Sequence, residues 1–317
     1  MFDSLPPVHS VDKLIDIAFR AGRKRALEVR GKRTPDKERK FYLAEEARVK
    51  VVGKVIEGEL KSIIHNFPSY ENLTPFYQRL LNLRISKDSY KKSLGAIGWA
   101  LKNLVKLREN TLKKMSRERE IKYVRAYLGR CCSLLKRVGK DMEMVKEIRN
   151  VLRSFPSIKE EPTLIIAGYP NVGKSTFMRR LTGAKVKIAP YPFTTKKIQI
   201  GYVKLGHKEF QIVDVPGILD RPSEKRNKIE NQAMLAISDL AHAILFILDP
   251  TQELKPQLNL LREIRSKFKV PIFIAVNKAD LLKKKNVPYQ EEKINFIFSA
   301  TNKEACWNVF REIAKVL

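Results

Sequence analysis

The first half of the chain carries hydrophobic residues at helical spacing. In residues 90–115, Leu94, Ile97, Leu101 and Leu104 recur at three- and four-residue steps, with lysines between them. Such spacing places the apolar side chains on one face of a helix and the charged ones on the other. The stretch therefore predicts an amphipathic helix with one buried stripe.

Two further stretches, residues 37–67 and residues 125–152, share this period. Long helices joined by short polar segments pack as antiparallel bundles. We expect Trp99 to pack in the core of this bundle or at its edge. For residues 21–40, which are rich in Arg and Lys, we expect a segment that is either mobile or in contact with RNA.

The pattern changes near residues 155–162, after which short apolar runs alternate with helical stretches. Runs rich in Ile, Val and Phe predict strands at 163–168, 198–205, 210–217, 243–249, 270–278 and 294–300. Several runs are apolar throughout, as in strands that are covered on both faces. We predict an α/β domain with a mostly parallel sheet flanked by helices over residues 159–317, preceded by an all-α helical bundle over residues 1–158.

The segment "GYPNVGKS", residues 168–175, lies between a predicted strand and a predicted helix. This is the context of a phosphate-binding loop (P-loop). Gly168 and Gly173 let the backbone curl so that its N–H groups face a phosphate, and the helix N-terminus adds its positive end. Lys174 can reach the β- and γ-phosphates, and the Ser175 hydroxyl can bind Mg²⁺. The segment therefore predicts a nucleotide site.

The residues "NKAD" after the strand at 270–278 indicate which base is bound. The Asp280 carboxylate can accept hydrogen bonds from N1 and the exocyclic amine of guanine. Adenine has no donor at N1 and would leave that carboxylate unpaired. In "FSAT", residues 298–301, the Ala300 N–H can meet the guanine O6. These motifs favour GTP over ATP.

Two more motifs complete the predicted site. "DVPG" supplies Asp214 for the Mg²⁺ shell, through a water, and Gly217 for a γ-phosphate contact. "PFTT" supplies Thr195 as a Mg²⁺ ligand when γ-phosphate is present. We assign catalytic roles to Lys174, Thr195, Gly217 and Asn171. The full set expected to contact the nucleotide is Gly168, Asn171, Val172, Gly173, Lys174, Ser175, Thr176, Phe193, Thr194, Thr195, Asp214, Gly217, Asn277, Lys278, Asp280, Ser299, Ala300 and Thr301.

The charge balance points to a polyanionic partner. The chain has a formal net charge of +29. Residues 1–160 contain 37 Lys and Arg against 19 Asp and Glu. An excess of this size favours nucleic acid as the partner, with anionic membrane surfaces second. The alternative is that the charge only keeps the protein soluble.

Other features narrow the class of protein. No run approaches 18 consecutive apolar residues, so we expect no membrane span. The N-terminus lacks the basic and apolar regions of a secretion signal, so we expect an intracellular protein. The three cysteines have no metal-ligand spacing and predict ordinary thiols.

The motifs resemble a known family. "GYPNVGKS", "APYPFTTK", "DVPGILDRP" and "NKAD" are similar to the Obg-like branch of the translation-factor-related GTPases. "KRTPDKERK", "HNFPSYENLTPFYQRLLNL" and "SLGAIGWALKNL" resemble the helical domain of the nucleolar GTP-binding protein 1 family. The resemblance covers nearly the whole chain. It implies GTP hydrolysis with Mg²⁺ and a role in assembling the large ribosomal subunit, bound to ribosomal RNA and the pre-ribosomal particle.

The family's eukaryotic members carry a long C-terminal extension that this chain does not show. The chain therefore resembles the shorter archaeal form, for which we expect a cytoplasmic location. We also expect a monomer.

One departure from signalling GTPases bears on catalysis. Ile218 follows "DVPG" where those proteins place the glutamine that orients the attacking water, so we expect slow intrinsic hydrolysis. In related GTPases an asparagine at the position of Asn171 helps bind K⁺ beside the phosphates, where it stabilises transition-state charge. The alternative is that Asn171 is a loop residue that tolerates unusual backbone angles.

Two function classes remain. The first is a GTP-hydrolysing assembly factor whose switch loops couple the GTP state to residence on ribosomal RNA. The second is a GTP-controlled signalling or stress switch with a different partner. A GTPase at a membrane surface is a weaker third class. The basic helical half favours the first.

Overall fold

A computed structural model describes residues 2–31, 36–183, 186–192, 197–216, 219–220, 228–281 and 292–317, without the side chains at 228, 229 and 231–233. The chain forms two compact units. The helical unit comprises Met1–Leu73 and Arg84–Arg153, and the α/β unit comprises Thr74–Leu83 and Ser154–Leu317.

This division differs from a single boundary after residue 158. The helix α3 (Pro75–Asn82) belongs to the α/β unit, although the three helices that follow it in the chain belong to the helical unit. The reason is a set of contacts made by Tyr77. Its buried hydroxyl donates to the Pro156 carbonyl oxygen at 2.9 Å and accepts from the Ile158 N–H at 3.0 Å, and its ring stacks on Phe155. These bonds tie α3 to the segment that enters the sheet.

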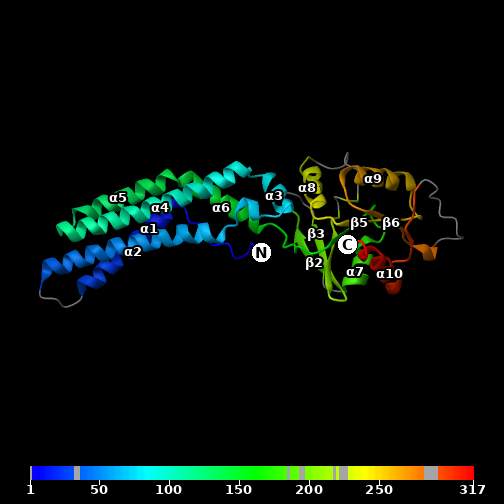
Figure 1. Cartoon of the computed structure of the whole chain (residues 1–317), viewed down its shortest axis with the longest axis horizontal. Helices are drawn as coiled ribbons and strands as arrows, with labels where there is room; N and C mark the ends of the chain where they lie inside the picture. The colour runs from blue at the N-terminus through cyan, green and yellow to red at the C-terminus, as the bar shows by residue number, and fades with distance from the viewer. Residues whose placement is uncertain are drawn as a thin grey trace. The chain divides into compact units, whose positions relative to one another are not determined.

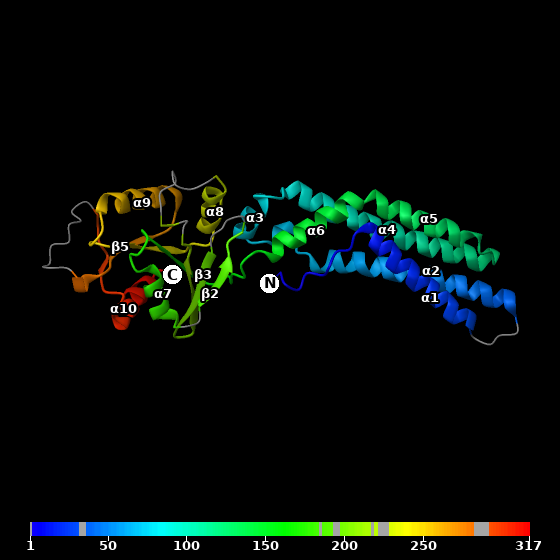
Figure 2. The ribbon, with the colours of Figure 1, turned by 180° about the vertical axis from the view of Figure 1, so that it is seen from behind.

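Long helices make up the helical unit (Figure 1). In chain order the elements are α1 (Val11–Gly31), α2 (Lys37–Asn66), the short 3₁₀ helix η1 (Tyr70–Asn72), α4 (Lys87–Glu118), α5 (Lys122–Arg137) and α6 (Gly139–Arg153). Helix α1 packs along α2, α2 packs on α4, and α5 and α6 follow one another along α4 (Figure 2). The predicted helical bundle is confirmed.

Two expectations for this unit can be compared with the structure. Residues 125–152 do not form one helix, because the backbone leaves helical geometry at Val138 and a new helix begins at Gly139. Residues 21–31 and 37–40 are helical, and the Asp36 side chain caps α2 by accepting from the Arg39 N–H at 2.9 Å. Residues 32–35 of that basic stretch lie outside the described residues.

The core of the helical unit follows the helical period. On α1 the buried residues Leu14, Ala18, Gly22 and Ala26 recur every fourth position. A Cβ at Gly22 would lie 2.6 Å from Val52 Cγ2, so glycine allows α1 to approach α2 closely. Trp99 is 40% exposed, and the Arg137 guanidinium lies 4.9 Å from its ring centroid. Trp99 therefore packs at the edge of the core.

The α/β unit is built on one seven-stranded sheet in the order β2-β3-β4-β1-β5-β6-β7. The strands are β1 (Thr163–Ala167), β2 (Val186–Pro190), β3 (Lys197–Leu205), β4 (Lys208–Asp214), β5 (Ala243–Leu248), β6 (Ile272–Val276) and β7 (Phe296–Ile297). Strands β2–β3 and β3–β4 pair antiparallel, and the remaining pairs are parallel. All six predicted strands are present, and β2 is an edge strand that the hydrophobic pattern did not predict.

Helices cover both faces of this sheet (Figure 1). They are α7 (Lys174–Thr182), α8 (Lys228–Ser238), α9 (Leu254–Lys267) and α10 (Lys303–Ala314). Helix α3 packs on α8, and a 3₁₀ turn η3 (Ala279–Leu281) follows β6. Alternate residues of β1 show the two-sided burial. Leu164 and Ile166 join the core with α7 and α10, while Ile165 is equally buried but lies outside that cluster. Among the described helices, none is long and apolar enough to cross a membrane.

Candidate nucleotide-binding site

The loop after β1 has the backbone geometry of a phosphate cradle. Gly168 has φ +139°, and a Cβ there would lie 2.4 Å from the Ile247 carbonyl oxygen. Gly173 has φ +102°, and a Cβ there would lie 2.2 Å from Asn277 Nδ2. Both positions therefore require glycine, for conformation and for space. The loop ends at the N-terminus of α7, where free backbone N–H groups favour an anion.

Lys174 lies at the start of α7 and is buried. Its ammonium donates to the carbonyl oxygens of Gly168 at 2.7 Å and Tyr169 at 2.8 Å. Burial lowers the pKa of Lys174, and the nearby Asp214 partly opposes that shift. The side chain is therefore folded back on its own loop, next to the position where the glycine geometry would place a phosphate.

Ser175 and Asp214 come together at the mouth of the loop. The Ser175 hydroxyl donates to Asp214 Oδ2 at 3.1 Å. Asp214 is fully buried, and burial raises its pKa to about 6. Within the described residues, its other oxygen, Oδ1, has no hydrogen-bond partner. A buried carboxylate oxygen without a partner fits a cation or a cation-bound water. These residues fit the Mg²⁺ site that the sequence predicts.

A pocket of about 380 Å³ opens over these groups. It is lined by Pro170, Asn171, Gly173, Lys174, Ser175, Thr176, Asp214, Pro216 and Asp220. Asn171 has φ +64° and is exposed, while Val172 is fully buried beneath the loop. The positive φ agrees with a residue chosen for loop conformation, and the exposed side chain is also free to meet an ion.

Asn277 joins two loops of the site. Its Nδ2 donates to the Val172 carbonyl oxygen at 2.7 Å, and its Oδ1 accepts from the Ala300 N–H at 2.7 Å. The Ala300 N–H, which we expected to meet the guanine O6, is thus occupied by Asn277 in this structure. A contact with O6 would require that bond to be exchanged.

The remaining predicted residues lie on the base side. Asp280 is exposed in η3, and the Ala279 N–H binds the Phe298 carbonyl oxygen at 3.2 Å. The hydroxyls of Ser299 and Thr301 are 2.7 Å apart. The structure therefore holds the two base-side loops together and leaves the Asp280 carboxylate open to a ligand.

Asp249, at the end of β5, was not predicted from the sequence. Its fully buried carboxylate forms an ion pair with Lys278 at 2.5 Å. It also accepts from the Thr251 N–H at 2.9 Å and from Gln252 Nε2 at 3.1 Å, and Gln252 reaches the Pro170 carbonyl oxygen. Lys278 has φ +61°, so this network fixes a strained residue. A carboxylate directly after an entirely apolar strand is the signal that could have indicated it.

Four of the predicted residues, Phe193, Thr194, Thr195 and Gly217, lie outside the described residues.

Comparisons with known proteins agree with this geometry. A family model described as "NOG1 N-terminal helical domain" matches residues 2–159, and one described as "50S ribosome-binding GTPase" matches residues 163–278. The chain belongs to the nucleolar GTP-binding protein 1 family. It is a GTPase, and a GTPase domain of this kind hydrolyses its nucleotide with Mg²⁺.

Its relatives differ in length. An uncharacterized protein of Methanocaldococcus jannaschii, MJ1408, is 40% identical over 90% of this chain and 83% of its own. The probable nucleolar GTP-binding protein 1 of Dictyostelium discoideum is 33% identical over 92% of this chain. The nucleolar GTP-binding protein 1 of Arabidopsis thaliana is 35% identical over 81% of this chain. The chain spans only 45% and 39% of these two relatives.

Proposed function

We propose that this GTPase is an assembly factor for the large ribosomal subunit. In this proposal it acts in the cytoplasm as a monomer, and it binds ribosomal RNA of the pre-ribosomal particle through its basic helical unit and switch regions. The observation that carries the proposal is the pairing of a nucleotide site with a strongly basic helical unit. The description of the family that residues 163–278 match, "50S ribosome-binding GTPase", supports the same partner.

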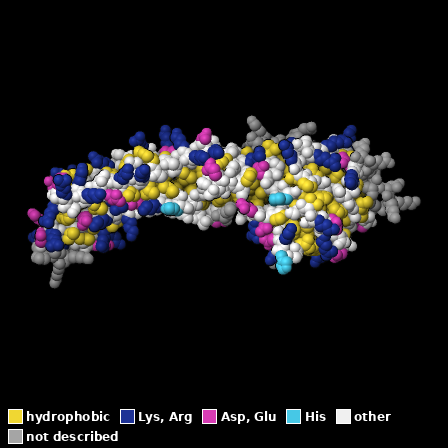
Figure 3. Space-filling model, viewed as in Figure 1, with side chains coloured by type: hydrophobic (Ala, Val, Ile, Leu, Met, Phe, Trp, Pro, Cys, Tyr) yellow, Lys and Arg dark blue, Asp and Glu magenta, His cyan; other side chains and the backbone are white. Residues whose placement is uncertain are grey.

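The charge distribution supports RNA as the ligand. Residues 1–160 carry 37 Lys and Arg against 19 Asp and Glu. Figure 3 shows dark-blue Lys and Arg side chains spread along the helical unit, with fewer magenta acidic side chains among them. Long helices that expose cations opposite a buried stripe contact phosphates with little readout of bases.

The nucleotide site suggests how the GTP state is sensed. In our proposal Ser175 binds Mg²⁺ directly and Asp214 does so through a water, which would satisfy the free Asp214 Oδ1. Bound Mg²⁺ neutralises charge that develops on the phosphates. Lys174 exchanges the Gly168 and Tyr169 carbonyl oxygens for phosphate oxygens. Thr195 completes the metal shell only when γ-phosphate is present, and Gly217 contacts that phosphate. The conformations of the two loops that contain Thr195 and Gly217 therefore depend on whether GTP or GDP is bound.

Base selection has a direct test. Asp280→Asn should weaken GTP binding strongly and admit xanthine nucleotides, because the donor pattern that the base edge must present is altered. Affinities of both proteins for GTP and XTP decide this point. Unchanged GTP affinity in the variant would remove Asp280 from the site.

The role of Asn171 in catalysis is a second proposal within the site. We propose that Asn171 helps bind K⁺ beside the phosphates, since no glutamine follows "DVPG". Hydrolysis should then be faster in K⁺ than in Na⁺, and Asn171→Ala should abolish the difference. Equal rates in the two salts would instead leave Asn171 as a loop residue with positive φ.

Co-sedimentation with ribosomal particles tests the function itself. The full chain, loaded with a GTP analogue, should sediment with large subunits or their precursors, and the GDP form should bind less. A small signalling GTPase under the same conditions serves as the control. Sedimentation no greater than that control would favour a GTP-controlled signalling or stress switch.

A further inference from the structure

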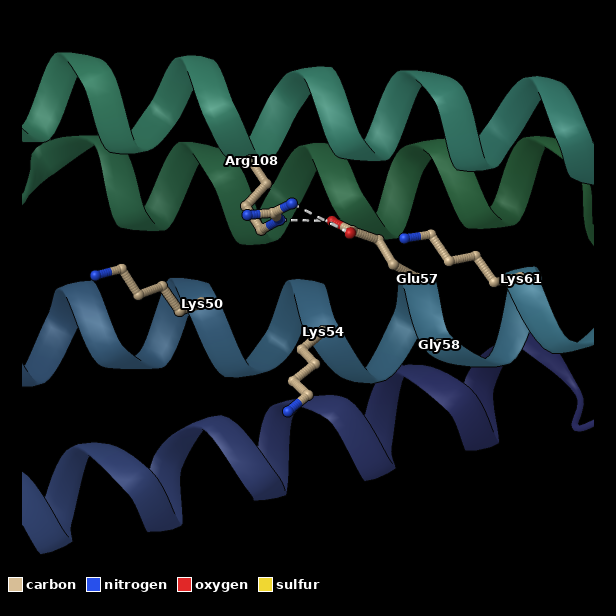
Figure 4. Close-up of a pocket in the computed structure, with 6 residues that line it drawn as sticks. All are labelled: Lys50, Lys54, Glu57, Gly58, Lys61 and Arg108. Carbon is tan, nitrogen blue, oxygen red and sulfur yellow. Dashed lines mark hydrogen bonds and ion pairs between the residues drawn. The ribbon is translucent and has the colours of Figure 1, made fainter.

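The helical unit contains a pocket of about 340 Å³ between α2 and α4 (Figure 4). It is lined by Lys50, Lys54, Glu57, Gly58, Lys61 and Arg108. Five of these residues come from one face of α2, and Arg108 reaches across from α4. Four cationic residues and one carboxylate therefore line a space whose volume is at the lower end of the range for ligand pockets.

Arg108 is held rigidly at the centre of this pocket. Its Nε donates to Glu57 Oε1 at 2.6 Å and its Nη2 to Glu57 Oε2 at 3.3 Å. The Glu57 side chain is only 7% exposed, and Gly53 makes room for the Arg108 stem, since a Cβ there would lie 2.3 Å from Arg108 Cδ. Such pairing fixes the plane of the guanidinium before any ligand arrives.

The fixed guanidinium still has a nitrogen that can donate hydrogen bonds to a ligand. Among the described residues, the third nitrogen of Arg108, Nη1, has no hydrogen-bond partner. The bond with Glu57 raises the pKa of Arg108, so the group stays charged. A guanidinium with free N–H groups in a fixed plane binds the oxygens of a phosphate.

The lysines around Arg108 differ in whether an acidic side chain neutralises them. Lys50 forms an ion pair with Glu46 at 2.7 Å. Lys54 and Lys61 are exposed and have no ion-pair partner within the described part of the chain. Figure 4 shows Lys61 extending toward Glu57 and Lys54 lying on the α1 side of the pocket. The Lys61 ammonium thus extends toward the Glu57–Arg108 pair, while the Lys54 ammonium adds an unneutralised positive charge at the edge of the pocket nearer α1.

We propose that this pocket binds a phosphate group of an RNA backbone. The inference rests on the proposed RNA-binding function and gives it a site. Apart from Gly58, every residue that lines the pocket is charged, and the excess of cations continues along the same unit, as a long polyanion requires. Free inorganic phosphate shares this chemistry and is the alternative source of the anion.

Gly58 permits a test that leaves every charge in place. It lies in the pocket, and a Cβ there would meet nothing within 4 Å. Gly58→Leu should fill the pocket without disturbing a neighbour, and leucine favours the helix more than glycine does. Gly95→Leu on α4 is the matched control, because Gly95 is also helical and exposed with nothing within 4 Å.

A pair of charge variants provides the second arm. Lys54→Gln/Lys61→Gln removes two charges from the pocket. Lys92→Gln/Lys102→Gln removes two exposed charges from α4 outside it, from lysines without a described partner. Neither pair should change the free energy of unfolding by more than about 0.5 kcal/mol.

The affinity of the full-length proteins for large-subunit RNA is measured across a salt series. We expect the pocket pair to lose about tenfold in affinity and to reduce the slope of log affinity against log salt by about one to two. Gly58→Leu should lose affinity without loss of stability, while both control variants should change affinity by less than about threefold.

The outcomes separate the inference from the function on which it rests. Loss of affinity in the pocket variants alone supports the site. Equal affinities in pocket and control variants, with RNA binding by the parent protein intact, would overturn the site only. No RNA binding by the parent protein would overturn both. Protection against thermal unfolding by inorganic phosphate in the parent, with unchanged RNA affinity in the variants, would assign the pocket to a small anion and overturn RNA as its ligand.

Discussion

The two candidate binding regions of this protein are built in opposite ways. In the nucleotide site, Asn277, Lys174 and Asp249 are buried, and each is fixed by bonds to backbone or to another side chain. In the pocket on α2, the lysines are exposed, Lys50 pairs with Glu46 at the surface, and the pair that is buried is Glu57–Arg108. A buried polar group supports both the fold and the ligand, whereas an exposed cation supports the ligand alone.

This difference leads to a general expectation about how substitutions in the two regions affect stability and affinity. Changes in the nucleotide site should cost stability and affinity together, because the same hydrogen bonds serve both. Changes to the pocket lysines should cost affinity for a polyanion while leaving stability unchanged. The Glu57–Arg108 pair is the one part of the pocket that should behave like the nucleotide site.

The largest effect is expected for Asn277→Ala. The variant leaves the Val172 carbonyl and the Ala300 N–H unpaired in a buried place. We expect a loss of about 4 kcal/mol in the free energy of unfolding and about hundredfold in GTP affinity. Denaturant unfolding and nucleotide titration measure the two. Asn308→Ala, at an exposed position of α10, is the control and should change stability by less than about 0.5 kcal/mol. A loss in only one of the two quantities would break the comparison.

Arg108→Ala should have the next largest effect on stability. It leaves the Glu57 carboxylate buried without its partner, which we expect to cost about 3 kcal/mol in unfolding free energy. The double variant Glu57→Ala/Arg108→Ala removes both charges and should recover part of that loss. Denaturant unfolding of the three proteins checks this. No recovery in the double variant would mean that packing of the Arg108 stem over Gly53, rather than the ion pair, carries the effect.

Asp249→Asn should weaken GTP binding by about tenfold and cost about 2 kcal/mol of stability, because both carboxylate oxygens accept from donors and the amide NH₂ would have to face either Lys278 or Thr251. Nucleotide titration measures the GTP affinity, and denaturant unfolding measures the stability. Lys278→Met and the double variant complete a mutant cycle. Additive effects in that cycle would show that the two residues act independently and that Asp249 does not position Lys278.

The nucleotide motifs were predictable because their spacing is dictated by the ligand. A P-loop needs Gly168, Gly173, Lys174 and Ser175 at fixed intervals, and in the structure Ser175 lies within hydrogen-bonding distance of Asp214. The sheet was also predictable, because its buried strands are nearly continuous apolar runs. These features depend on short stretches of chain.

The features that sequence reasoning missed depend on contacts between distant residues. Glu57 and Arg108 are 51 residues apart, and each was expected only to lie on the polar face of its own helix. Strand β2 is an exposed edge strand without an alternating pattern, and α3 belongs to the α/β unit through Tyr77. Periodicity describes one element at a time and does not show which polar residues of two elements meet.

The smallest of the predicted effects is the dependence of folding stability on pH through Asp214. Burial raises the pKa of Asp214 in the nucleotide-free protein to about 6, while an unfolded Asp titrates near about 3.9. Between these values the folded state holds a proton that the unfolded state releases. Stability should therefore fall as pH rises from about 4 to about 6, by on the order of 1–2 kcal/mol.

Denaturant unfolding across that range, without nucleotide or Mg²⁺, measures the fall. Asp214→Asn should flatten the curve, because the amide does not titrate. An equally steep decline in the variant would assign the proton to another group and would contradict a raised pKa for Asp214.

The proposed function requires the helical unit to be the surface that contacts large-subunit RNA. Photochemical crosslinking of the GTP-analogue form to that RNA, with mass spectrometric identification of the crosslinked peptides, tests this directly. We predict that most crosslinks fall in the helical unit, with peptides that contain Lys54, Lys61 or Arg108 among them. Crosslinks confined to the α/β unit, or no more numerous than with an unrelated RNA of equal length, would contradict it.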